Sequence, residues 1–140
     1  MERDRVAPYV GAVGCLVLAS LLSIPYAVID TQPGVLGAYY NAGPIGIVGV
    51  IFLSILGIVI FLSSVRGRAD AELIAGIMLV VGVVIFGMTA LWAGWLLAVD
   101  PASLYSFPAE YAWIEYHPWA ALAVSGVVAA AGGLYATAVR

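Results

Sequence analysis

The residues of this sequence with the most chemical potential are four carboxylates and a histidine in two polar segments. They are Asp30, Asp100, Glu110, Glu115 and His117. Carboxylates and imidazole bind Zn²⁺ and also serve as general acids and bases. The chain has no second histidine, and the spacing matches no metal motif. We therefore interpret the group as a solvated acidic rim with His117 as a polar cap at an interface. A metal or catalytic site at these five residues is the alternative.

Other signatures of chemistry are missing from the chain. There is no glycine-rich phosphate loop, no G-x-S-x-G and no H-E-x-x-H. Cys15 is the single cysteine, so it cannot form an internal disulfide, and we expect a small buried side chain. No basic patch is available to bind nucleic acid. The sequence predicts neither a cofactor nor an enzymatic activity.

The composition places these residues in a membrane protein. Hydrophobic residues make up 64% of the chain and charged residues 9%, whereas a soluble domain carries roughly 25% charged residues. The mean hydropathy is +1.10. A membrane-spanning helix needs ~20 apolar residues, and four runs free of charge satisfy that length. The sequence predicts an all-α membrane protein, in which residues 1–140 form one transmembrane domain. The four predicted spans are residues 6–29, 43–65, 73–99 and 118–139.

Polar segments and prolines define the ends of these spans. Residues 30–42 and 100–117 are predicted loops on one side of the membrane, and residues 66–72 are a turn on the other. Pro25 should kink the end of the first span, because proline lacks an N–H group and clashes with the preceding turn. Pro44 and Pro118 stand near the predicted starts of the second and fourth spans, where proline is tolerated.

The basic residues give the predicted bundle a direction. With four spans, all five arginines fall on one side, and the chain has no lysine. The positive-inside rule places that side in the cytoplasm. The sequence thus predicts a multi-pass protein of the cell membrane, a four-transmembrane-helix bundle with both termini cytoplasmic. The arginines are Arg3, Arg5, Arg66, Arg68 and Arg140.

The two predicted hairpins share an outline. Asp30 and Asp100 each follow an outward span, and Pro44 and Pro118 each open an inward one. A hairpin repeated in the same orientation would be a parallel repeat about an axis along the membrane normal. The alternative is that any two membrane hairpins resemble each other to this extent.

Small residues recur every fourth position in the last predicted span. Inside lipid, such residues let helix backbones approach closely. We predict that this row packs inside the bundle; the alternative is contact with a partner chain, either a second copy or another membrane protein. The row is Ala121, Ser125, Ala129, Gly133 and Thr137.

Aromatic residues gather near the outward side of the predicted bundle. Residues 108–116 are predicted to form a short interfacial helix whose apolar face, with Phe107, Tyr111 and Ile114, rests on lipid.

Hydroxyl side chains inside the spans are predicted to bond to carbonyl groups of their own helices.

The excess of acid, the lack of lysine and the four-span layout resemble small uncharacterised membrane proteins of halophilic archaea. That resemblance implies no activity. The lipid bilayer is the predicted environment, and a structural, accessory or protein-interaction role is the favoured function. A small-solute transporter or channel subunit is the alternative, followed by an enzyme or metal site at the membrane interface. A polar cavity at mid-membrane would favour transport, whereas a closed, dry interior would disfavour it.

Overall fold

The structure is a computed structural model that describes residues 2–29, 33–65, 70–99 and 107–139. Within these ranges every regular element is helical, as predicted. The elements are α1 (Glu2–Val28), α2 (Pro33–Tyr40), α3 (Val48–Val65), α4 (Ala71–Gly94), the π-helix η1 (Trp95–Val99), the 3₁₀-helix η2 (Ala109–Glu115) and α6 (His117–Ala138).

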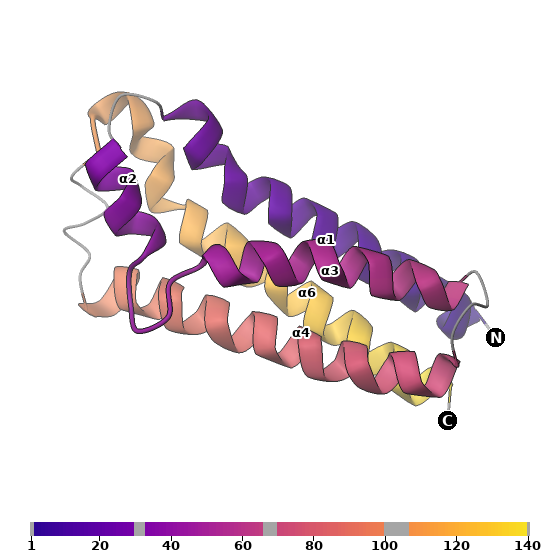
Figure 1. Ribbon diagram of the computed structural model, residues 1–140. Helices are drawn as coiled ribbons and strands as arrows, with labels where there is room; N and C mark the ends of the chain where they lie inside the picture. The colour runs from indigo at the N-terminus through magenta and orange to yellow at the C-terminus, as the bar shows by residue number, and fades with distance from the viewer. Residues whose placement is uncertain (1, 30–32, 66–69, 100–106, 140) are drawn as a thin grey trace.

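The four long helices lie side by side (Figure 1). α1 packs against α3 and α6, and α4 packs against the same two helices on the opposite side. The start of α1 and the end of α6 share one end of the molecule with the end of α3 and the start of α4 (Figure 1). We call this the terminal end. α2 and η2 lie at the other end, which we call the α2 end.

Three helical stretches are long and apolar enough to cross a membrane. They are Val6–Val28, Ala71–Val99 and Ala109–Ala138. Val48–Ser63 in α3 is a shorter apolar helix. Membrane-compatible helices are thus confirmed.

The helix starts agree with the sequence at Pro118 and differ from it at Pro44. Asp70 caps α4, since its carboxylate accepts a hydrogen bond from the Glu72 N–H at 3.2 Å. Pro118 lies in the first turn of α6, as predicted. The expected start near Pro44 is wrong, because α3 begins at Val48. Gly46 precedes it with a φ of +80°, which ends any helical path, and a Cβ there would lie 2.9 Å from the Tyr40 carbonyl oxygen.

The predicted loop over residues 30–42 contains α2. Two carbonyl groups at the end of this short helix accept hydrogen bonds from the residues that follow it. Gly37 O accepts from the backbone and side-chain N–H groups of Asn41, and Tyr40 O accepts from the Ile47 N–H at 3.0 Å. The turn that follows therefore ties α2 to the start of α3.

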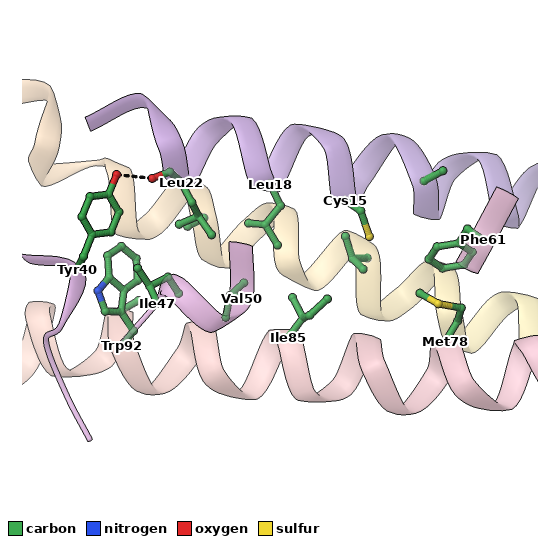
Figure 2. Close-up of a cluster of buried hydrophobic side chains, with 14 of the residues drawn as sticks. Cys15, Leu18, Leu22, Tyr40, Ile47, Val50, Phe61, Met78, Ile85 and Trp92 are labelled. Atoms are coloured by element: carbon green, nitrogen blue, oxygen red, sulfur yellow. Dashed lines mark hydrogen bonds between the residues drawn. The ribbon is translucent and has the colours of Figure 1, made fainter. Parts of the chain in front are cut away.

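The interior is filled by large apolar side chains from all four long helices (Figure 2). Along its axis lie Leu18 and Leu22 of α1, Phe61 of α3, and Met78 and Ile85 of α4, each fully buried. Cys15 is buried among them, as predicted. Sequence hydropathy identified these helices, and burial on one face of each now defines the core.

Most described hydroxyl groups inside the helices bond to their own backbone, which confirms that prediction for Ser23, Ser63, Thr89, Ser125 and Thr137. Ser54 differs, since its buried Oγ has no hydrogen-bond partner among the described residues.

Candidate functional site

Pro25 interrupts α1 near the α2 end and leaves a backbone group to be satisfied. In a regular helix the N–H of residue 25 would bond to the carbonyl of Leu21. Proline has no N–H, so Leu21 O loses its helical partner. A buried carbonyl without a donor costs free energy, particularly inside a membrane. The sequence therefore requires another donor at this place.

His117 supplies that donor from the first residue of α6. Its Nε2 lies 2.6 Å from Leu21 O, and because a carbonyl oxygen can only accept, Nε2 carries the hydrogen. Nδ1 of the neutral imidazole is then an acceptor, and the Tyr39 hydroxyl donates to it at 2.5 Å. Only 3% of the His117 surface is exposed. One imidazole thus joins α6 to both α1 and α2.

The hydroxyl of Tyr40 bonds to the next pair of backbone groups in α1. Its hydroxyl donates to Leu22 O at 2.5 Å and accepts from the Tyr26 N–H at 3.1 Å. In a regular helix that N–H and that carbonyl would bond directly to each other. The hydroxyl of Tyr40 has been inserted between them, and Figure 2 shows its bond to Leu22. Two consecutive carbonyl groups of α1, at Leu21 and Leu22, therefore bond to side chains of other helices.

Aromatic rings surround the Tyr39–His117 hydrogen bond. The indole N–H of Trp92 donates to Tyr39 O at 2.8 Å, which adds α4 to the same network. The Tyr39 ring lies edge-on to Trp92, Tyr40 and Phe107, with centroids 5.1 to 5.8 Å apart, a favoured geometry. The rings of Trp113 in η2 and His117 are also edge-on, with centroids 6.3 Å apart. We call this group the Tyr39–His117 cluster; its members are Tyr39, Tyr40, Trp92, Phe107, Trp113 and His117.

The chemistry available to the cluster is limited by its burial. Burial, followed by the nearby Tyr40, raises the pKa of the Tyr39 phenol far above its usual value, so the phenol stays neutral. Burial also raises the pKa of Tyr40. Each ring nitrogen of His117 already has a protein partner. The arrangement therefore joins helices and leaves no free nitrogen for a metal or a substrate.

Of the predicted acidic rim, the structure describes Glu110, Glu115 and His117. Glu110 is exposed, Glu115 is half-buried, and His117 is turned into the protein. Asp30 and Asp100 lie outside the described residues. In the described part of the chain, no three His, Cys, Asp or Glu side chains are placed to hold a metal ion. His117, which we expected to be a polar cap at an interface, is buried, and its ring bonds to the Leu21 carbonyl and the Tyr39 hydroxyl.

The predicted apolar face of residues 108–116 is also turned inward. Phe107 and Ile114 are buried in the core, and Tyr111 is half-buried. The expectation that this face rests on lipid is wrong, because Tyr39 and His117 provide an aromatic surface for it inside the protein.

The row of small residues in α6 changes its surroundings along the helix. Ala121 and Ser125 are buried, Ala129 and Gly133 are half-buried, and Thr137 is exposed. A row at every fourth residue drifts around a helix with 3.6 residues per turn, so the buried face continues through other positions. Those positions are Val128, Gly132 and Ala136.

Sequence reasoning named His117 but missed Tyr39, Tyr40 and Trp92 as its network. One signal was available. Pro25 fixes Leu21 as the residue whose carbonyl loses its partner, and a donor had to come from elsewhere. Which of the many Tyr, Trp and Ser side chains would supply it depends on tertiary packing.

Searches of the curated proteins and of the solved structures found no match. A family model does match the chain. Its description agrees with the resemblance to uncharacterised proteins, while an origin in a halophilic archaeon stays a prediction. Over residues 1–140 the sequence matches a family described as a family of unknown function (DUF7548), and the chain belongs to that family.

Proposed function

We propose that this protein is a four-span integral membrane protein with a structural or accessory role, and with both termini in the cytoplasm. The observation that carries the proposal is the filled interior, which the Tyr39–His117 cluster holds together at the α2 end. A transport path needs polar surface at membrane depth. Here, fully buried Leu18, Ile85 and Trp92 occupy the space between the described helices.

The position of α3 supports its assignment as the fourth membrane-spanning helix. It packs against α1 and α4, two of the helices long enough to cross a bilayer. Its 18 residues correspond to about 27 Å at 1.5 Å per residue, close to a hydrocarbon core of ~30 Å. Small mismatches of this kind are absorbed by local thinning of the bilayer. If α1 and α4 cross the membrane, α3 must lie at the same depth.

Charge supports the orientation. The start of α1, the end of α3, the start of α4 and the end of α6 lie at the terminal end, and in the sequence every arginine lies within these helix ends or within three residues of one. Glu110 and Glu115 belong to η2 at the α2 end. The positive-inside rule then favours a cytoplasmic terminal end. The two hairpins, α1 with α3 and α4 with α6, remain candidates for a parallel repeat.

Cysteine labelling tests the four spans and their direction. Ala112→Cys in η2 should react with a membrane-impermeant maleimide on intact cells, whereas Glu72→Cys in α4 should react only after permeabilisation. Both positions are exposed. The wild-type protein is the matched control, because Cys15 is buried. Labelling of Glu72→Cys on intact cells, or of both variants alike, would contradict the proposed topology.

The filled interior gives a test against the transporter or channel alternative. Vesicles that contain the purified protein should release a trapped small solute no faster than protein-free vesicles. Faster release by the wild-type protein would favour a channel subunit over an accessory role. The partner in an accessory role would be a second copy or another membrane protein.

A further inference from the structure

A long apolar groove runs between α1 and α6 on the outside of the molecule. Its first half is lined by Val6 and Val10 of α1 and by Val127 and Leu134 of α6. Its second half continues from Val10 and Val127 to Val17 and Val124. Each half has a volume of about 410 Å³. Because the halves share Val10 and Val127, they form one continuous α1–α6 groove.

Small side chains create the floor of the α1–α6 groove, and branched ones create its walls. Ala7 and Ala131 are buried at the floor, whereas Val10, Val127 and Leu134 are exposed along the sides. Lipid tails are as apolar as leucine, so a tail gains little from an apolar surface alone. A channel with walls on both sides offers additional van der Waals contacts to one chain. The shape of the surface therefore favours a single ordered tail.

The length and position of the α1–α6 groove match one leaflet of a bilayer. From Val6 to Val17 the helix rises about 16 Å at 1.5 Å per residue. Half of a hydrocarbon core of ~30 Å is about 15 Å. The groove starts at the terminal end, directly after the first turn of α1, and stops near the middle of the span.

The sequence places a positive charge in register with the mouth of the groove. The α1 residues along it include Val6, Ala7 and Val10, and Arg3 precedes them by three, four and seven positions. Residues at these separations share one helix face. Arg3 thus belongs to the turn of α1 that precedes the groove, and basic residues attract anionic lipid at a membrane surface.

We propose that the α1–α6 groove binds an acyl chain of an anionic phospholipid from the leaflet at the terminal end, with its phosphate near Arg3. The proposal rests on the proposed membrane function. The occupant is a lipid because the groove has the length of one leaflet and Arg3 precedes its first residue by about one helical turn in the sequence, whereas a helix of a second copy would follow the full span.

Native mass spectrometry, after reconstitution in vesicles of mixed phosphatidylcholine and phosphatidylglycerol, shows which lipid stays bound to the protein. The wild-type protein should retain phosphatidylglycerol in preference to phosphatidylcholine. Ala130→Phe should lose it, because Ala130 lines the groove. Ala123→Phe is the matched control; Ala123 is exposed on the same helix and belongs to neither half of the groove, so this variant should retain the lipid. Arg3→Gln should lose the preference for phosphatidylglycerol while the helical content measured by circular dichroism stays unchanged.

Three results would overturn the proposal. Equal retention of phosphatidylglycerol by Ala130→Phe and Ala123→Phe would show that the groove is not the binding site. Equal retention of the two lipids by the wild-type protein would show that the site does not select an anionic headgroup. A dimer that Ala130→Phe abolishes would make a second copy the occupant. Flotation with the vesicles separates these results from failure of the membrane proposal, because a protein that does not float with lipid contradicts the membrane role itself.

Discussion

At the scale of single residues, Leu21 and Leu22 connect the sequence of α1 to the rest of the protein. Pro25 removes the partner of Leu21 O, and the hydroxyl of Tyr40 separates Leu22 O from its own. Both carbonyl groups then depend on side chains that are distant in the sequence. His117 has the more demanding role, because it bonds at once to α1 and to α2.

A double-mutant cycle tests the role of His117. His117→Phe keeps a ring but leaves Leu21 O without a donor, so we expect it to destabilise the protein by about 1 kcal/mol or more, since an unpaired buried carbonyl costs about 1–3 kcal/mol. Pro25→Ala restores an N–H that can bond to Leu21 O. The double variant should therefore lose less stability than the sum of the single variants, as measured by unfolding in mixed micelles. Additive effects would contradict a hydrogen bond between His117 and Leu21.

Tyr40→Phe should be milder than His117→Phe. Without the Tyr40 hydroxyl, Tyr26 N–H and Leu22 O can bond directly to each other as in a regular helix. We expect a loss of stability below about 1 kcal/mol, because no backbone group is left unpaired. The unfolding assay used for His117 measures both variants, and a larger loss for Tyr40→Phe would show that the kink cannot close.

Alkaline pH should weaken the Tyr39–His117 cluster. Burial raises the pKa of Tyr39, so above about pH 10, the ordinary pKa of tyrosine, the unfolded chain releases this proton while the folded protein keeps it. The stability contribution is complete below that pH and is lost as the pH rises. Thermal unfolding midpoints should fall more steeply above pH 10 for the wild-type protein than for Tyr39→Phe. Equal slopes would contradict a buried neutral phenol.

At the scale of helices, the contact between α4 and α6 includes a close backbone approach at Gly132. A Cβ at Gly132 would lie 2.8 Å from the carbonyl oxygen of Met78, a backbone atom that cannot rotate away. The neighbouring Gly133 belongs to the row predicted from sequence, and a Cβ there would meet only Leu79 Cδ1 at 4.0 Å. The helix pair is therefore more sensitive at Gly132 than at Gly133.

Gly132→Ala and Gly133→Ala form a matched pair on adjacent residues. Gly132→Ala should destabilise the protein by about 1–3 kcal/mol, the usual cost of overpacking. Gly133→Ala should be neutral or slightly stabilising, because alanine favours a helix over glycine by up to about 1 kcal/mol. Unfolding in detergent measures both. A greater loss for Gly133→Ala would place the close contact on the row predicted from sequence.

At the scale of the whole molecule, the tryptophans divide into an inner and an outer set. Trp92 is 1% exposed, whereas Trp119 is 58% exposed. Both lie near the α2 end, on the side where the sequence predicts that aromatic residues gather. Hydrogen bonding to Tyr39 O brings Trp92 inside, and Trp119 has the exposed position expected of an interfacial residue.

Brominated lipids test this division in single-tryptophan variants. Emission from Trp119 should be quenched strongly in vesicles of brominated phosphatidylcholine, and emission from Trp92 should be quenched weakly. The same samples in unbrominated lipid are the control. Strong quenching of Trp92 would mean that the cluster opens to lipid.

The sequence by itself determined the helical class, the approximate ends of the long helices and their membrane-compatible length and hydropathy. These properties follow from local composition, since runs of apolar residues and prolines act over a few turns. The site depended on contacts between distant residues. His117 could be named from its type alone, but its partners are 78 residues away at Tyr39 and 96 residues away at Leu21. Only the tertiary structure decided that His117 faces inward, because the carbonyl left unpaired by Pro25 in α1 had to be satisfied by whichever donor packing brought beside it.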